Sequence, residues 1–346
     1  MKRILFFSAV AAIAFSSCSK SEVYENDSEL NAISLSSYSA KSTKSAGLIE
    51  ANAFKPGDIF DVYAYSSDAQ GFANEVSSTP DFMKDLDVNV GGTSSALTYT
   101  YSPVRYWPTD EVNNLLTFFA TYPANNNNLK PDFSANKLGS YTYTVSTDAA
   151  KQYDFMLADP AIDQTFNNTN SNVKGLVKLN FHHMLSQINF SVKLADDLDA
   201  ATTVTLKSIT LNNISDKGVV AIENTDVVSN NWTVEGSKAY PVAKLANTEL
   251  STTAVATSGE TSLILLPQAL AAGEKTFTVV YELQTVVGDD TYTITNTHTF
   301  DLKKGDIESW ANNGKYTYTI TIGLNVIKFT ASVADWEENK EATIEY

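Results

Sequence analysis

The residues of this sequence that can do chemistry beyond ordinary packing are few, and the most informative of them is one cysteine. Cys18 is the only cysteine among the 346 residues, and it closely follows a predominantly apolar segment, residues 4–15. A solitary thiol is neither half of an intrachain disulfide nor an adequate metal site. Its position therefore indicates a point of covalent attachment.

The segment before this cysteine has the layout of a secretory signal peptide. A basic pair precedes the apolar run, which at twelve residues is too short to cross a bilayer as a stable helix. Two serines then lead into Cys18, which looks like a bacterial lipobox, although Phe15 stands where leucine is commoner. The lipobox implies that residues 1–17 are removed and that Cys18 is acylated, for example with palmitate. More than one acyl chain gives stable membrane anchoring. The alternative is an ordinary signal peptide with an incidental cysteine.

The three histidines do not form a ligand set. His182 and His183 are adjacent, so on a strand they point to opposite faces and cannot both bind one ion. We expect them to be core or interface side chains, and we expect His298, in an alternating threonine strand, to be exposed. The acidic residues 195–200 lack the glycine and the distal glutamate of an EF-hand loop. No metal site is predicted, and this stretch is interpreted as a solvated turn.

Motifs of the common enzyme classes are missing from the sequence. It contains no Gly-x-Ser-x-Gly elbow, no P-loop and no Cys–His pair. A glycosidase needs two carboxylates that face a cleft, and spacing selects no such pair among 40 acidic residues. We therefore predict a protein that is not an enzyme and that needs no cofactor.

Composition excludes further classes of protein. The net charge of −16 argues against a nucleic-acid partner, because such recognition needs a basic face. Arginine occurs only at Arg3 and Arg105, so the guanidinium forks common in nucleotide sites are nearly absent. A hydrophobic content of 43% excludes wholesale disorder. The chain after the leader is long enough for two domains with substantial cores.

The elements expected to position these residues are strands. Short segments rich in Val, Ile, Thr, Tyr and Phe recur along the chain, as in the alternating residues 57–66. Few stretches have a helical period, and the clearest is one turn expected at residues 306–312. The pattern predicts an all-β fold of tandem β-sandwiches. The predicted divisions are a tether with a first strand and a cleavage loop (18–47), an N-terminal sandwich (48–172) and a C-terminal sandwich (173–346).

Several segments, in their order and spacing, resemble the fimbrillin family of Gram-negative gut and oral anaerobes, the subunits of type V pili. The resembling segments are the lipobox at Cys18 and residues 54–65, 106–123, 179–192, 263–268 and 315–338. The family fold is two transthyretin-like β-sandwich domains, in agreement with the predicted strands.

The resemblance implies assembly by strand exchange. A first strand, with Ile33 and Leu35 as buried anchors, would fill a groove in the N-terminal sandwich. A trypsin-like extracellular protease would cut after Lys41 or Lys44, since this chain lacks the arginine that oral members of the family use here. The end of a neighbouring subunit would then enter the groove by β-strand addition. The residues predicted for this donor strand are Phe329, Ala331, Val333, Ala342, Ile344 and Tyr346. The same last residues could instead form an ordinary closing strand of their own domain.

Three functions remain open from the sequence. The first is a structural subunit of a surface fimbria, tethered to the outer membrane by its lipid before cleavage and joined to other fimbrial subunits afterwards. The second is a tip or anchor subunit of the same family. The third is a surface glycan-binding lipoprotein, in which exposed aromatic rings stack on sugars. Against the third, Tyr106, Trp107 and Trp336 lie at strand ends beside apolar runs, where packing in the core or against a linker is expected.

Overall fold

The structure is a computed structural model, and within its described residues the chain is all-β. No α-helix occurs there, and the helical elements are five short 3-10 turns: η2 (Phe72–Asn74), η3 (Ala149–Lys151), η4 (Val227–Ser229), η5 (Ala243–Leu245) and η6 (Gly259–Thr261). The described residues are 31–38, 54–75, 77–124, 129–134, 136–196, 198–223, 225–323 and 327–336. The all-β prediction is confirmed, whereas the helical turn predicted at residues 306–312 is wrong. That segment contains β21 (Ser309–Trp310), whose partner is a strand distant in sequence.

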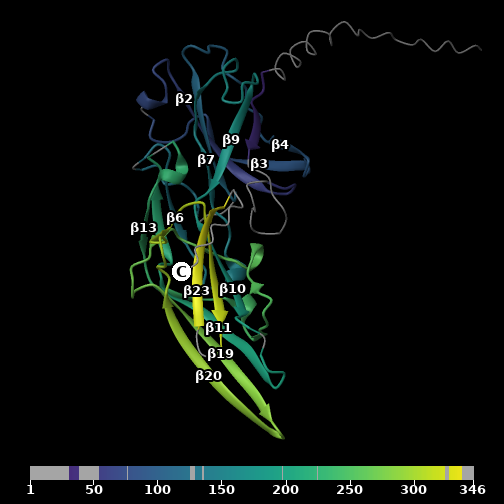
Figure 1. Ribbon diagram of the computed structural model, residues 1–346. Helices are drawn as coiled ribbons and strands as arrows, with labels where there is room; N and C mark the ends of the chain where they lie inside the picture. The colour runs from purple at the N-terminus through teal and green to yellow at the C-terminus, as the bar shows by residue number, and fades with distance from the viewer. Residues whose placement is uncertain are drawn as a thin grey trace, which may run out of the picture.

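The largest sheet has eight strands and occupies one end of the elongated molecule (Figure 1). In spatial order it contains β1 (Ser34–Tyr38), β9 (Leu176–His183), β7 (Met156–Asp159), β5 (Leu115–Tyr122), β2 (Ile59–Ser67), β3 (Met83–Thr93) and β4 (Ala96–Tyr101), and β8 (Ala161–Gln164) also pairs with β5. The strands β1 and β4 are the two edges of this order.

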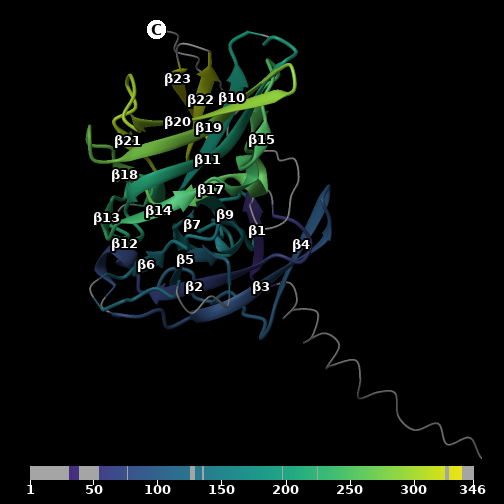
Figure 2. The same ribbon diagram turned by 90° about the horizontal axis from the view of Figure 1, so that it is seen from below.

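Two five-stranded sheets form the other end of the molecule. One contains β16 (Val255–Ala256), β10 (Ser186–Leu194), β22 (Gly314–Ile322) and β23 (Ile327–Asp335), with β17 (Leu263–Leu265) beside β10. The other contains β14 (Lys238–Pro241), β11 (Thr202–Ile214), β19 (Thr276–Val287) and β20 (Asp290–Asp301), with β15 (Thr248–Glu249) beside β11. Figure 2 shows the sheet of β10, β22 and β23 lying over the sheet of β11, β19 and β20, which is a sandwich-like arrangement.

Two small sheets complete the fold, and one of them joins the two ends of the molecule. It contains β13 (Trp232–Glu235), β12 (Lys217–Ala221) and β6 (Ser140–Thr144), so a strand from the first half of the chain pairs with strands from the second. The other pairs β18 (Gln268–Ala269) with β21. The strand β9, which follows the division predicted at residue 172, lies in the eight-stranded sheet. The chain therefore leaves that sheet at His183, after the predicted boundary.

The period of two along the strands distributes apolar side chains between two cores. On β5, Phe118 enters a cluster that covers one face of the eight-stranded sheet, and the next residue, Phe119, enters the cluster on the other face. The second cluster continues into the sandwich at the other end of the molecule, with Phe190 and Phe277 among its members. A strand buried on both faces explains why residues 115–122 form a nearly continuous apolar run.

Candidate functional site

The candidate site is the groove that holds β1 at the edge of the eight-stranded sheet. The strand β1 pairs in parallel with β9 over five residues, from Ser34 opposite Leu176 to Tyr38 opposite Asn180. The N–H of Ser34 also donates to the carbonyl of Gly175, at 2.9 Å. One side of the β1 backbone is thus fixed by a strand that lies far away in the sequence.

The other side of the backbone, at residues 31–33 just before β1, is held by the last residue of β4 and by the residues that follow it. The N–H of Ile33 donates to the carbonyl of Arg105, and the N–H of Trp107 donates to the carbonyl of Asn31, each at 2.9 Å. The hydroxyl of Tyr101 donates to the carbonyl of Ile33 at 2.6 Å. The segment 31–38 is therefore held on one side by residues 101–107, at its beginning, and on the other side by β9, from Ser34 onward.

The side chains of this segment alternate between the core and the surface. Ile33 and Leu35 are 2% and 5% exposed and belong to the apolar cluster of the eight-stranded sheet, whereas Ser34 between them is exposed. On β4, the hydroxyl of Tyr99 is 2.7 Å from that of Ser37. Burial of an aliphatic side chain of this size contributes about 1.5–3 kcal/mol. Most of the apolar stabilisation of this short segment therefore comes from two residues.

Gly175 is the residue that brings the backbones of the groove together. Its carbonyl accepts both from Ser34 and from the indole N–H of Trp107, the latter at 3.2 Å. Its φ of +73° lies in the left-handed region, where glycine is favoured. A Cβ at this position would lie 2.9 Å from Cε2 of Phe166. The position therefore requires glycine for both its conformation and its space.

The geometry determines what the loss of β1 would do. The backbone of β9 from Leu176 to Asn180 would lose its partner, and the apolar surface under Ile33 and Leu35 would be uncovered. Unpaired strand edges beside apolar pockets are templates for another chain. In this structure β1 occupies the groove, as an extended segment whose apolar residues Ile33 and Leu35 are two positions apart.

The C-terminal residues predicted for a donor strand lie in β23, as far as the structure describes them. The strand β23 pairs with β22 over nine residues without a register shift. The ring of Phe329 packs between those of Phe277 and Phe300, with centroids 5.4 and 4.9 Å away. Ala331 is buried and Val333 is 43% exposed. The strand β23 thus closes its own sheet here.

The residue after β23 ties this strand to the eight-stranded sheet. The indole of Trp336 stacks on the imidazole of His183, the last residue of β9, with ring centroids 4.0 Å apart. Nδ1 of His183 is 2.7 Å from a carboxylate oxygen of Asp154, and both of these side chains are fully buried. Sequence reasoning predicted buried positions for His183 and Trp336, but it missed their contact because nothing local signals it.

The other two histidines also have specific neighbours. Nε2 of His182 is 2.9 Å from the carboxylate of Asp159, whose other oxygen accepts from the N–H of Val227 at 3.1 Å. Burial raises the pKa of Asp159, but the hydrogen bonds from His182 and Val227 outweigh it, so the pKa is lowered overall. His298 is half-buried because its ring stacks with those of Tyr281 and Phe300, so the expected exposure is wrong.

A cluster of acidic residues lies on β2 and β3. Burial, a hydrogen bond with Asp87 and the nearby charge of Asp85 raise the pKa of Asp61 to about 7. Asp85 itself accepts from the hydroxyl of Tyr63 at 3.0 Å and forms an ion pair with Lys130. Among the described residues, no group of three or more His, Cys, Asp or Glu side chains is arranged to hold a metal ion.

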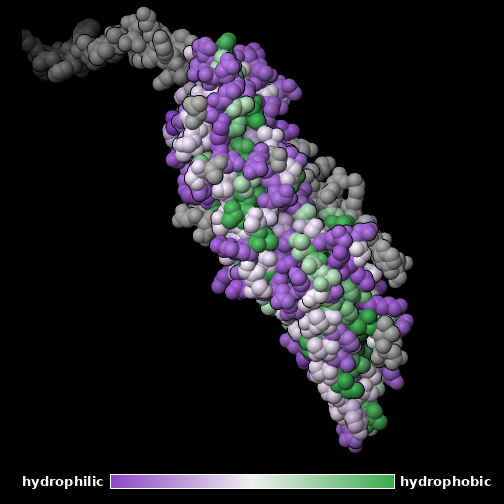
Figure 3. Space-filling model, turned by 90° about the vertical axis from the view of Figure 1, so that its left-hand side faces the viewer, coloured by the Kyte–Doolittle hydropathy of each residue, from purple (hydrophilic) through white to green (hydrophobic). Residues whose placement is uncertain are grey.

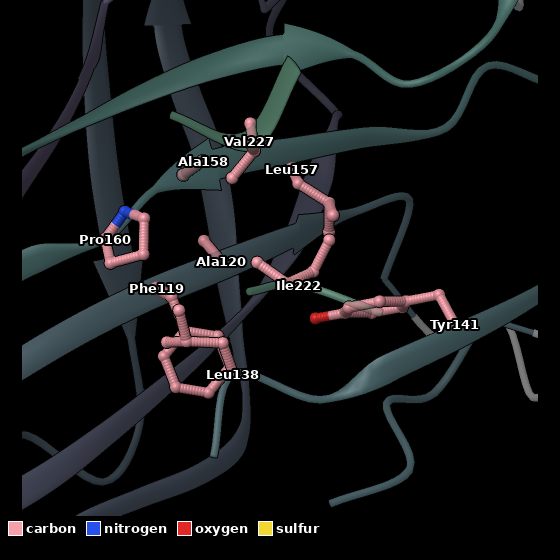
Figure 4. A pocket seen from close by; sticks show the side chains of 9 residues that line it. All are labelled: Phe119, Ala120, Leu138, Tyr141, Leu157, Ala158, Pro160, Ile222 and Val227. Atoms are coloured by element: carbon pink, nitrogen blue, oxygen red, sulfur yellow. The ribbon is translucent and has the colours of Figure 1, made fainter. Parts of the chain in front are cut away.

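A small apolar pocket lies where η4 and β12 meet the eight-stranded sheet (Figure 4). Its volume of about 10 Å³ is at the lower limit for one water molecule, so it is a packing defect rather than a ligand site. The residues that line it are Phe119, Ala120, Leu138, Tyr141, Leu157, Ala158, Pro160, Ile222 and Val227.

Among the helices of the described part of the chain, none has the length and apolarity to span a membrane.

The sequence also matches a family model, described as fimbrillin-like, over residues 43–336. The chain belongs to the fimbrillin-like family. The resemblance stated from the sequence is therefore confirmed. The family consists of fimbrial structural subunits, which also confirms the prediction that the protein is not an enzyme.

Three proteins are similar to this fimbrillin-like chain over most of its length. The fimbrium subunit Fim1C of Phocaeicola vulgatus is 23% identical over 377 aligned residues, with 97% of each chain covered. A crystal structure of a fimbrial protein from Bacteroides vulgatus matches with a TM-score of 0.68 and 22% identity, over 88% of this chain and 99% of that one. A candidate cell adhesion protein from Bacteroides uniformis matches with a TM-score of 0.53 and 17% identity, over 88% and 97% of the two chains. At these identities the two structures show the fold.

Several predicted site residues lie outside the described residues. They are the lipidation site Cys18, the cleavage sites Lys41 and Lys44, and the last part of the predicted donor strand, Ala342, Ile344 and Tyr346. The described part of the site is the β1 groove with Ile33 and Leu35, and β23 with Phe329, Ala331 and Val333.

Proposed function

We propose that this protein is a structural subunit of a surface fimbria that assembles by strand exchange. It is exported as a lipoprotein acylated at Cys18 and held at the outer membrane. An extracellular trypsin-like protease then cuts after Lys41 or Lys44 and releases β1. Each half of the chain corresponds to a transthyretin-like sandwich in this proposal.

The observation that carries the proposal is the way β1 is held. It is a five-residue strand with one buried anchor, Leu35, within it and another, Ile33, directly before it, and the nearest predicted cleavage site, Lys41, follows it by only a few residues in the sequence. Cutting there would disconnect the strand from the domain that it completes. The groove could then be filled only by a strand that supplies the same backbone pairs and apolar side chains.

The donor strand comes from the end of the chain in this proposal. Ala342, Ile344 and Tyr346 repeat the apolar spacing of Ile33 and Leu35. Phe329 and Ala331 can serve as donors only if β23 leaves β22, which breaks nine residue pairs and the aromatic contacts of Phe329. The final residues are therefore the preferred donor, and release of β23 would extend their reach.

A tip or anchor subunit is the second candidate, and one observation favours it. The strand β23 is held on its own domain both by β22 and by the stack of Trp336 on His183. A subunit that keeps β23 in place, and whose final residues do not serve as a donor, would accept a donor without providing one. The glycan-binding alternative is weakened, because the indoles of Trp107 and Trp336 are only 5% exposed and offer no platform for a sugar ring. The packing expected for Tyr106 is wrong, since this side chain is 45% exposed.

Controlled proteolysis of the purified full chain tests the proposal. Trypsin should convert it to a ladder of oligomers that resist dissociation, with new N-termini at Ser42 or Ser45. The double variant Lys41→Gln/Lys44→Gln should remain uncut in this region and should form no such ladder. A variant that ends at Trp336 should be cut but should not polymerise. Cleavage without oligomers in the intact chain would contradict a stalk role and support a tip role, whereas an anchor would keep its lipid and escape cutting.

A further inference from the structure

The long edge of β20 is a second surface at which another chain can add. Its twelve residues pair with β19 without a register shift, and no described residue pairs with its other edge. Every second residue of such an edge directs its N–H and C=O away from the sheet. Soluble proteins protect long edges with lysine, proline, bulges or a covering segment. Between Asp290 and Asp301 the strand has no lysine, no proline and no bulge.

Exposed apolar side chains accompany this edge. Val286, Val287, Tyr292 and Ile294 belong to one hairpin, and the last two are 58% and 62% exposed. In Figure 3 the tapered end of the molecule shows white and green residues along much of its length. Clustered exposed apolar residues mark interaction sites. The edge and its apolar residues together indicate an interface.

The two faces of β20 differ in composition. Its odd-numbered positions between the terminal aspartates carry only threonine, and all of these threonines are exposed. The even-numbered positions are Tyr292, Ile294, Asn296, His298 and Phe300. A partner strand must therefore match a hydroxyl face and an apolar, aromatic face in the same register, because a slip of one residue exchanges the faces.

We propose that two copies of this protein join their β20 edges antiparallel, about a two-fold axis at Ile294. In this register Ile294 meets Ile294 of the second copy, and Tyr292 lies opposite Asn296. Asp290 lies opposite His298, and every threonine in the overlap lies opposite a threonine. Like faces therefore coincide, and the exposed side chain of Ile294 is buried against that of the second copy.

Charge and hydrophobic burial favour this register over those with an axis at Thr295 or Asn296. A two-fold axis at Thr295 would place Asp301 opposite Asp289 of the second copy, and directly opposed like charges destabilise a strand pair. An axis at Asn296 would separate the two Ile294 side chains. The contact uses neither β1 nor β23, so it goes beyond head-to-tail strand exchange and would join subunits laterally. A single strand pair is a small interface, so its effect increases where subunits are repeated.

Cysteine cross-linking of the full chain carrying Cys18→Ser tests the contact and its register. The Cβ atoms of directly opposed residues lie about 4.5–5.5 Å apart, near disulfide range, whereas diagonal neighbours are about 7–8 Å apart. Ile294→Cys should form disulfide-linked dimers. A mixture of Thr293→Cys with Thr295→Cys should cross-link more than either variant alone. The matched control is Val219→Cys, at an exposed position on β12.

Sedimentation of the same chain without added cysteines provides the second measurement. The protein should dimerise at high concentration, and Ile294→Lys should raise the dissociation constant on the order of tenfold or more, whereas Val219→Lys should not. Because Ile294 is exposed, the variant should keep its fold, and trypsin-induced oligomers should still form if strand exchange is correct. Monomers at every concentration, or cross-linking of Ile294→Cys no greater than that of Val219→Cys, would overturn the inference. Cross-linking by Asn296→Cys but not by Ile294→Cys would overturn the register.

Discussion

The indole ring of Trp336 lies flat on the imidazole ring of His183, with an angle of 3° between their planes. The first residue follows β23, and the second ends β9, the strand that pairs with β1. One contact therefore connects the C-terminal strand to the strand that forms one wall of the β1 groove.

Replacing Trp336 should loosen the C-terminal strand. We expect Trp336→Ala to lower the free energy of unfolding by about 3–5 kcal/mol, because it removes a large buried ring. It should also speed hydrogen exchange along β23. Trp336→Phe should lose much less, since the indole N–H has no hydrogen-bond partner among the described residues. The control Val333→Ala alters a more exposed position, and an equal loss in that variant would contradict the role of the stack.

The two buried anchors, Ile33 and Leu35, should contribute most of the affinity of the groove for the segment that contains β1. Ile33→Ala and Leu35→Ala should each lower the free energy of unfolding by about 2–5 kcal/mol, because each creates a cavity in a packed core. Denaturant titration measures this loss. Ser34→Ala, at the exposed position between the anchors, should change stability little. If all three variants were equally stable, β1 would not be held by its side chains.

Gly175→Ala should disturb the groove from the β9 side. The added methyl group would contact Phe166, and alanine at a positive φ is strained by about 1–2 kcal/mol. We expect faster hydrogen exchange at the N–H of Ser34, whose acceptor is the Gly175 carbonyl. The matched control is Gly288→Ala, which has a φ of +65° but no neighbouring atom within 4 Å of its Cβ. It should show the backbone strain without the effect on β1.

The buried carboxyl of Asp61 should make stability depend on pH. Burial raises its pKa to about 7 in the folded chain, from an ordinary value of 3.8. Between these values the folded chain retains a proton that the unfolded chain has lost, so the stability from this group falls as the pH rises toward 7. The loss between pH 5 and 8 should be on the order of 2 kcal/mol.

Asp61→Asn should abolish this part of the pH dependence and should be the more stable protein at pH 8. Denaturant titration at pH 5, 6, 7 and 8 measures the effect. The control is Asp289→Asn, which changes an exposed carboxylate in the turn between β19 and β20 and should leave the slope unchanged. A parallel slope in wild type and Asp61→Asn would show that Asp61 titrates normally.

The sequence by itself determined which segments are strands and which way their side chains face. The alternation in residues 57–66 and 329–333 is local, because the period of two follows from the geometry of a single strand. Ile33 and Leu35 could be predicted as buried for the same reason. The lone cysteine and the absence of enzyme motifs are likewise readable without any fold, and the order of the resembling segments indicated the family.

Only the tertiary structure decided which strands meet. Many strands of this chain have similar composition, so local pattern could not pair β1 with β9, place β6 beside β12, or keep residues 176–183 in the first sheet. Nor could it bring His183 to Trp336 or leave the edge of β20 without a partner strand among the described residues. Strand partners are selected by the burial of whole faces and by hydrogen bonds between distant segments, and that selection is a property of the complete fold.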